Sequence, residues 1–264
     1  DPGTADTFTV DINWGDGSGV ETITLDASST GSQSFRQTHR YLDDNPTATP
    51  SDSYIIKATA TDNDTGTGSM STTVEVVNVA PIVALDAVNA IVENGMATLD
   101  GTVTDPGTAD TFTVDINWGD GSGVETFTLD ASATGNPPGS QTFTLTHQYL
   151  DDNPTATASD SYIIEATVTD NVTGTGKMST TVKVDNVAPT VALDAVVAIV
   201  ENGLATLSGT VTDPGTEDTF TVDIDWGDDS GVETFTLDAS ATGSQNFTLT
   251  HQYLDDNPTA TASD

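Results

Sequence analysis

The sequence predicts an all-β protein made of tandem β-sandwich modules, and three observations carry this prediction. Short segments alternate apolar and polar residues with the period of two that is typical of strands with one buried face. Turn-forming sequences such as DPG, GDGS and DDNP separate these segments. The whole pattern returns about every hundred residues, and no segment has a sustained helical apolar period.

The repeat defines the predicted modules. DPGTADTFTVDINWGDGSGVET begins at Asp1 and recurs at Asp105, and a near copy begins at Asp213. A repeat of this length matches the ~100 residues of an immunoglobulin-like sandwich and exceeds the roughly 20 to 50 residues of a solenoid repeat. The segments VVNVAP and VDNVAP mark the joints, where a proline ends the last strand of a module. We therefore expect modules at 1–78, lacking its first strands, at 79–186, complete, and at 187–264, lacking its last strands.

Within the complete module each strand is justified by its own alternation. The clearest run is FTVDINW, in which apolar side chains alternate with Thr, Asp and Asn. A four-residue insert at 136–139 marks a surface turn, because insertions are tolerated in loops. The residues expected to face inward, strand by strand, are Ala97, Leu99 and Val103; Phe112, Val114, Ile116 and Trp118; Phe127 and Leu129; Phe143 and Leu145; Tyr162, Ile164, Ala166 and Val168; and Met178, Thr180, Val182 and Val184.

Composition excludes several classes of function. The 264 residues contain no cysteine, which excludes disulfides and thiol chemistry. Five basic residues stand against 41 acidic ones, for a formal net charge of -36, so nucleic acid and anionic membrane surfaces are not expected partners. Such acidity is typical of disorder, of high-salt surroundings or of bound divalent cations. The regular alternation argues against disorder, and no apolar run reaches the roughly 20 residues of a membrane helix.

A family resemblance follows from three motifs in order. WGDGSGVET at Trp118, the H-x-Y formed by His147 and Tyr149, and SYIIEATVTD at 161–170 resemble the PKD (polycystic kidney disease) domain. Corresponding pieces occur in the other two copies, so the resemblance covers essentially the whole chain. It implies an immunoglobulin-like sandwich with Greek-key topology, of the kind found in arrays on bacterial surface proteins. It also implies an extracellular spacer, adhesion or assembly role without catalysis.

Structural roles explain the most conspicuous motifs. The Asp-Gly of GDGS supplies the positive φ values of a tight hairpin, and Asp229 of the third copy is expected to keep that turn. Trp118 is expected to face the core rather than a sugar. No nucleophile or oxyanion motif accompanies His147, so Tyr149 is interpreted as a tyrosine that closes a turn, with the histidine packed beside it.

The acidic loops carry the functional signal. Strand direction places the GDGS, DDNP and VENG turns at one pole of a module and the DPGTAD and TDNVTG loops at the other, so acidic loops meet at each joint. Hard oxygen ligands in this number suit Ca²⁺, although no segment matches an EF-hand loop. The rival interpretation is a solvated, self-repelling acidic surface suited to seawater or brine. The candidate ligands are Asp16, Asp43, Asp44, Asp52, Asn78, Asp105, Asp110, Asp151, Asp152 and Asp170.

The expected function is a non-enzymatic, secreted or surface-exposed repeat region that acts as a stiff spacer, with calcium at its joints. Its partners would be neighbouring modules of the same or identical chains. One alternative is a self-assembling subunit of a filament, sheath or surface layer, since incomplete modules expose sheet edges. A further alternative, an accessory carbohydrate-binding module of a secreted hydrolase, requires exposed aromatic side chains.

Overall fold

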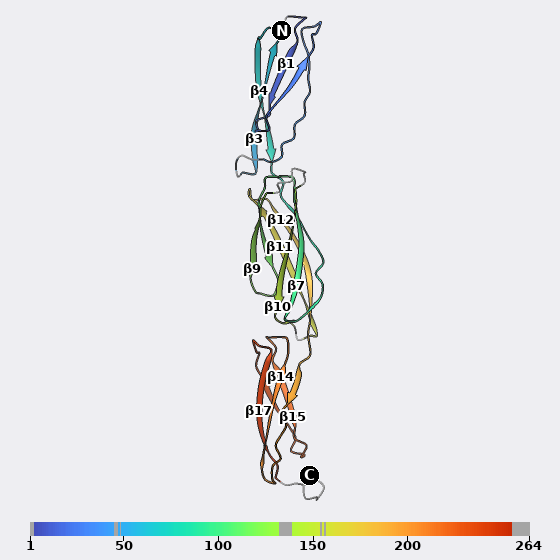
Figure 1. Ribbon diagram of the computed structural model, residues 1–264, viewed down its shortest axis with the longest axis vertical. Helices are drawn as coiled ribbons and strands as arrows, with labels where there is room; N and C mark the ends of the chain where they lie inside the picture. The colour runs from blue at the N-terminus through green and yellow to red at the C-terminus, as the bar shows by residue number, and fades with distance from the viewer. Residues whose placement is uncertain are drawn as a thin grey trace.

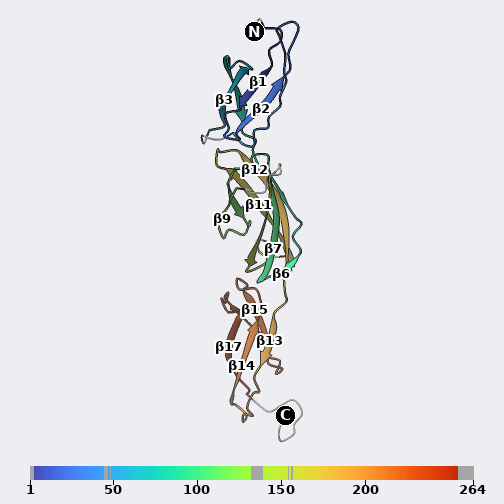
Figure 2. The same cartoon turned by 45° about the horizontal axis from the view of Figure 1, so that its top comes forward.

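The computed structural model describes residues 3–44, 47, 49–131, 139–153, 155 and 157–254. Over this part of the chain the fold is all-β, with the three repeats in line as a rod, the first at one end and the third at the other (Figure 1). The tilted view shows the same end-to-end order (Figure 2). No helix among the described residues is long and apolar enough to cross a membrane. Residues 136–138 of the predicted surface turn lie outside the described residues.

The second repeat is a complete sandwich of two sheets. One sheet has the order β10-β7-β5 and the other β6-β12-β11-β8-β9, which is the arrangement of an immunoglobulin-like fold. All of its ladders are antiparallel except the short pairing of β6 with β12. Its strands are β5 (Ile82–Leu85), β6 (Ile91–Val92), β7 (Gly95–Asp105), β8 (Phe112–Asn117), β9 (Val124–Leu129), β10 (Gly139–Tyr149), β11 (Ser159–Asp170) and β12 (Thr175–Asp185).

The outer repeats contain parts of the same arrangement. The first forms one sheet, β2-β1-β3-β4, from β1 (Phe8–Asn13), β2 (Val20–Leu25), β3 (Ser51–Asp62) and β4 (Thr67–Val77). The third forms sheets β13-β14-β17 and β15-β16, from β13 (Thr190–Leu193), β14 (Leu204–Thr212), β15 (Phe220–Asp225), β16 (Val232–Leu237) and β17 (Ser244–Gln252). Among the described residues no ladder joins strands of different repeats.

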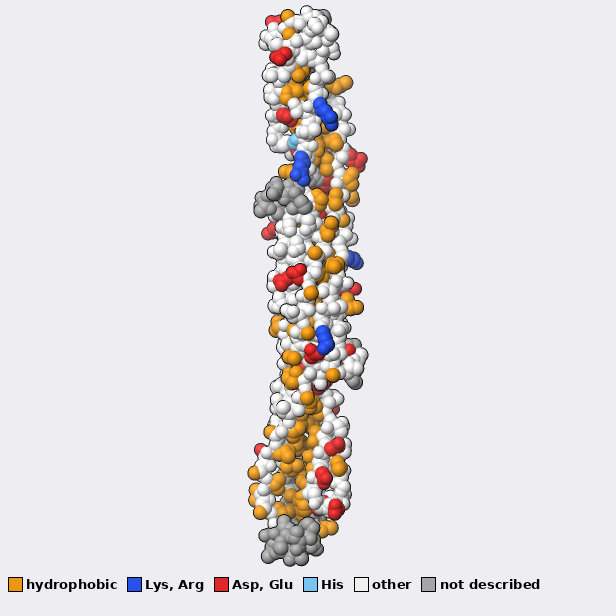
Figure 3. Space-filling model, turned by 90° about the vertical axis from the view of Figure 1, so that its right-hand side faces the viewer, with side chains coloured by type: hydrophobic (Ala, Val, Ile, Leu, Met, Phe, Trp, Pro, Cys, Tyr) orange, Lys and Arg blue, Asp and Glu red, His pale blue; other side chains and the backbone are white. Residues whose placement is uncertain are grey.

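The core of the second repeat lies between its two sheets, where the alternation placed it. Val114, Ile116 and Trp118 of the β8 run are almost completely buried, as are Leu99 on β7 and Ile164 on β11. In the third repeat the corresponding apolar side chains line an open cleft of about 810 Å³ and are visible on the surface (Figure 3). In the second repeat β11 and β12 pack over that position and complete the core.

One inward-facing prediction is wrong. Met178 on β12 is 46% exposed, although Val182 and Val184 on the same strand are buried. The reason is its place at the sheet edge, because β6 pairs with β12 only at Val184 and Asp185. Beyond that point β12 has β11 as its single ladder partner, so a neighbouring strand covers Met178 on one side only.

An aromatic column stabilises the end of each sandwich. Trp118 stacks on His147 with ring centroids 4.8 Å apart, and His147 meets the edge of Tyr149 at 4.9 Å. The Tyr149 hydroxyl donates a hydrogen bond of 2.8 Å to the Trp118 carbonyl oxygen. Tyr149 therefore ties the end of β10 to the end of β8, rather than closing a turn nearby in sequence. The same contacts recur at Trp14 and Trp226.

Replacing Tyr149 with Phe is expected to destabilise the second repeat by about 1 to 3 kcal/mol, because the buried Trp118 carbonyl loses its donor. Thermal or denaturant unfolding measures the change. Tyr41→Phe is the matched comparison, since Tyr41 makes the same bond to Trp14 in a more exposed setting and should cost less. Equal or larger loss at Tyr41 would contradict the role of burial.

The GDGS turn is a hairpin whose glycines need left-handed backbone. Gly121 has φ of 83°, and Asp229, its counterpart in the third repeat, adopts φ of 61°, so the predicted turn survives the substitution. Gly119 is required for a second reason, because a Cβ atom there would lie 2.4 Å from the Ile163 carbonyl oxygen. This close approach brings the turn against β11 at the pole that faces the third repeat.

Candidate metal centres at the joints between repeats

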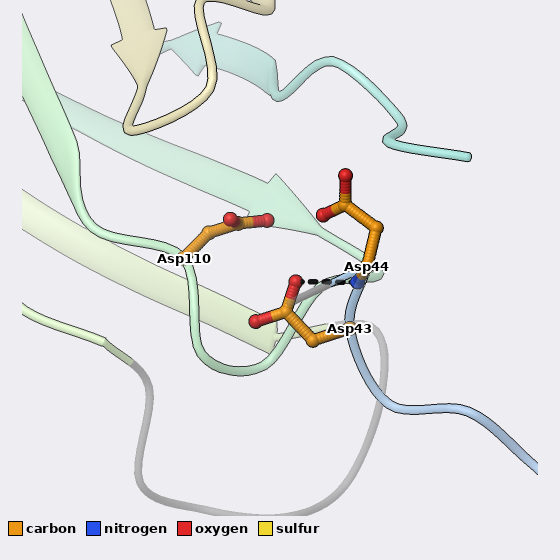
Figure 4. A group of neighbouring side chains, drawn as sticks. All are labelled: Asp43, Asp44 and Asp110. Carbon is orange, nitrogen blue, oxygen red and sulfur yellow. Dashed lines mark hydrogen bonds between the residues drawn. The ribbon is translucent and has the colours of Figure 1, made fainter. Parts of the chain in front are cut away.

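Joint 1, where the first repeat meets the second, gathers three carboxylates. Asp43 and Asp44 follow the aromatic column of the first repeat, and Asp110 lies in the loop between β7 and β8. One carboxylate oxygen from each lies within 4.8 Å of the others, and the three side chains converge on one space (Figure 4). Carboxylates from two repeats are thus brought together at the predicted place.

Hydrogen bonds fix how the two repeats meet. The Thr108 amide donates to the Leu42 carbonyl oxygen at 3.1 Å, and Thr216 makes the equivalent bond to Leu150 at 3.2 Å at joint 2, where the second repeat meets the third. At joint 1 the Asn78 Nδ2 also donates to Asp170 Oδ2 at 2.9 Å. The two joints therefore share this backbone contact.

Several carboxylate oxygens at joint 1 are buried without a hydrogen-bond donor. Asp110 is 1% exposed and neither of its carboxylate oxygens has a partner. Asp105 Oδ2 and Asp44 Oδ2 are also buried without a hydrogen-bond partner. Buried polar atoms are normally paired, so these oxygens are available to a shared proton or to a cation.

The electrostatics of joint 1 agree with this interpretation. Burial, followed by the charges of Asp43, Asp105 and Asp170, raises the pKa of Asp110 to about 7. Burial and the neighbouring Asp43 raise the pKa of Asp44 to about 6. Burial is also the main cause of the raised pKa of Asp105. The folded protein therefore holds charges here that need compensation by protons or by cations.

The structure distributes the remaining predicted ligands of joint 1 differently. Asp170 is buried, and its Oδ1 accepts hydrogen bonds from Val172 and Gly174 while Oδ2 accepts from Asn78. Asp52 accepts two hydrogen bonds from Thr47, at 3.0 Å and 2.6 Å. Neither belongs to the group of three carboxylates. Both lie close enough to this group for their charges to act on it.

Asp16 lies outside that group. Its Oδ1 accepts hydrogen bonds from Ser18, and its Oδ2 lies 2.6 Å from His39 Nε2. Burial alone would raise its pKa, but the hydrogen bonds from Ser18 and His39 outweigh burial and lower the pKa to about 2. The carboxylate already has its partners within the first repeat.

Joint 2 contains the predicted Asp151 and Asp152 together with three residues that the sequence interpretation missed. One group of close carboxylates consists of Glu93, Asp151 and Asp152, and another consists of Glu93, Asp213 and Asp218. Asp213 and Asp218 are the repeat counterparts of Asp105 and Asp110, so the repeat itself could have found them. Glu93 belongs to the VENG turn, which strand direction places at this pole, but it is not among the predicted ligands.

The donor set fits a hard divalent cation. All candidate ligand atoms are oxygens, and separations up to 4.8 Å suit Ca²⁺, whose ligands lie at about 2.3 to 2.6 Å from the ion. The glycines of the DPG segments leave room for the carboxylates. A Cβ atom on Gly107 would lie 2.1 Å from Asp110 Oδ2, and one on Gly215 would lie 2.5 Å from Asp218 Oδ2.

No protein-family model matches the chain, and no curated protein matches it. The solved structures that are similar to this chain include three with several domains in tandem. The crystal structure of a tetra-tandem repeat in the extending region of a large adhesion protein matches at 20% identity and a TM-score of 0.44, over 93% of this chain and 58% of that one. Dpr2 Ig1-Ig2 in complex with DIP-Theta Ig1-Ig3 matches at 13% identity and a TM-score of 0.32, over 94% and 80%. PcdhgB3 EC1-4 matches at 12% and 0.29, over 95% and 67%.

This chain therefore spans less than two thirds of the adhesion-protein structure. At these TM-scores the similarities decide nothing about function, which is inferred from the joints alone.

Proposed function

We propose that the chain is a non-enzymatic, extracellular repeat region in which calcium ions at the joints hold neighbouring sandwiches in line. Each repeat acts as one PKD-type module, with 79–186 the complete one. One observation carries the proposal: Asp110 holds two buried carboxylate oxygens without donors, facing acidic side chains of the preceding repeat. A cation there removes the cost of the buried charge only while the two repeats remain docked.

A spacer role follows from where the sites lie. Asp43 and Asp44 belong to one repeat and Asp110 to the next, so an ion that binds all three opposes bending at the joint. Acting along an array, such ions convert a flexible chain of domains into a stiff rod. The charge of -36 supports a surface that repels anionic partners and attracts divalent cations.

The alternatives have less support. A carbohydrate-binding module needs an exposed aromatic platform, but Trp118 is 1% exposed and its ring is stacked on His147. Assembly into a filament, sheath or surface layer stays a prediction, since no contact among the described residues favours it over the spacer role.

Calcium titration followed by isothermal calorimetry tests the proposal. We expect saturable binding and a higher melting temperature in CaCl₂ than in chelator. In small-angle X-ray scattering, the distance distribution should be longer and narrower in CaCl₂ than in chelator. NaCl at equal ionic strength is the control, because the rival interpretation is simple screening of a self-repelling surface. If NaCl reproduces the whole effect, or if calcium produces no heat and no thermal shift, the proposal is wrong.

A further inference from the structure

Glu93 occupies a special place at joint 2. It follows β6, and its amide donates to the Asp185 carbonyl oxygen at 3.0 Å, which holds it beside the end of β12. Its Oε1 accepts a hydrogen bond of 2.6 Å from the Val187 amide, in the segment that leads to the third repeat. The residue is 1% exposed, and its Oε2 is buried without a donor. One carboxylate therefore contacts the linker and also points into the acidic cluster.

Two groups of carboxylates share this residue. Glu93 groups with Asp151 and Asp152 from its own repeat, and separately with Asp213 and Asp218 from the next. Each group contains a further buried oxygen without a donor, Asp152 Oδ2 in the first and Asp213 Oδ2 in the second. The unpartnered oxygens thus occur on both sides of Glu93.

Charge also favours more than one ion. The two groups together bring five carboxylates to joint 2, so one divalent cation leaves an excess of three negative charges and two cations leave one. A carboxylate has about four lone-pair positions, so the bond from Val187 leaves Glu93 able to contact two ions. Gly215 keeps the space open, because a Cβ atom there would lie 2.6 Å from Glu93 Oε2.

We propose that joint 2 binds two divalent cations of the calcium class, with Glu93 as their shared ligand. This inference rests on the proposed calcium-dependent function. It makes Glu93 the residue through which both ions hold the linker, since loss of either ion changes the environment of the carboxylate that fixes Val187.

Counting bound ions by native mass spectrometry of the 264-residue chain in CaCl₂ tests the inference. Asp218→Asn and Asp151→Asn should each lower the number of bound ions by one, because each removes a ligand from a single group. Glu93→Gln should lower it by two. Glu201→Gln is the matched control, since Glu201 is the exposed counterpart in the third repeat and should leave the number unchanged.

A loss of one ion in all three joint variants would overturn the shared-ligand proposal and leave one ion at joint 2. A wild-type chain that binds no calcium would instead contradict the proposed function itself. Fluorescence or circular dichroism in saturating calcium shows whether Glu93→Gln keeps the β-sandwich fold. If that variant unfolds, energy transfer between Tb³⁺ and Eu³⁺ bound to the wild-type chain, measured with Asp110→Asn to weaken joint 1, provides the second readout. Absence of transfer there also overturns the proposal.

Discussion

In the absence of divalent cations, the protein is expected to be more stable at pH 5 than at pH 8. Burial and nearby carboxylates raise the pKa of Glu93 to about 7 and the pKa of Asp218 to about 6. They raise the pKa of Asp110 to about 7 and that of Asp44 to about 6. A carboxyl whose pKa is higher in the folded state gives stability below its unfolded pKa, near 4, and loses it as the pH rises through 6 to 7.

The expected loss between pH 5 and pH 8 is a fall of at least about 10 °C in melting temperature. One carboxyl with a pKa near 7 accounts for about 2 to 3 kcal/mol over this range, and about 1 kcal/mol shifts the melting temperature of one repeat by roughly 4 to 8 °C. Scanning calorimetry of protein freed of metal by dialysis measures it. Saturating CaCl₂ should remove or reverse the trend, because calcium competes with protons for the same oxygens.

General repulsion among the 41 acidic residues changes little over this range, because ordinary carboxyls ionise near pH 4. A variant carrying both Glu93→Gln and Asp110→Asn keeps that repulsion and should lose much of the pH effect. An unchanged pH profile in that variant would show that the joint carboxylates are not its cause.

Most of the fold was predictable because it depends on local alternation. Val114 and Ile116 alternate with polar residues along β8, and both are completely buried. Met178 continues the same alternation on β12, but its exposure depends on how far β6 extends along the sheet, which a pattern within one strand does not contain. Met178 is therefore exposed at the edge of the sheet although the alternation within β12 predicts that it is buried.

The candidate site was predictable only in part. Strand direction was enough to expect Asp43, Asp44 and Asp110 at one joint, and the structure brings them together. Asp16 stands in an equally acidic loop, but its oxygens are occupied by Ser18 and His39. The role of Glu93 depends on a two-residue strand beside β12, so its contact with Val187, 94 residues away, has no signal in local sequence.

Replacing Asp110 with Asn is expected to change stability in opposite directions with and without calcium. Without calcium at pH 8, the wild-type protein holds a charged, buried Asp110 next to Asp43 and Asp105. A pKa raised from 3.8 to about 7 corresponds to about 4 kcal/mol between the charged and neutral forms. The neutral amide avoids this cost and adds donors, so Asp110→Asn should stabilise the metal-free protein by up to several kcal/mol.

With saturating calcium the sign reverses, because the amide removes a charged ligand whose oxygens otherwise contact the ion. Calcium affinity at joint 1 should fall by at least about tenfold, equivalent to about 1.4 kcal/mol. Thermal unfolding in EDTA and in CaCl₂ at pH 8 measures both effects, and Asp86→Asn, an exposed carboxylate with the same change in charge, should alter neither. If Asp110 had a purely structural role, its replacement would change the stability in the same direction in EDTA and in CaCl₂. Only a ligand that is costly when its ion is absent and useful when the ion is bound gives the reversal, so this variant separates metal binding from the general acidity of the chain.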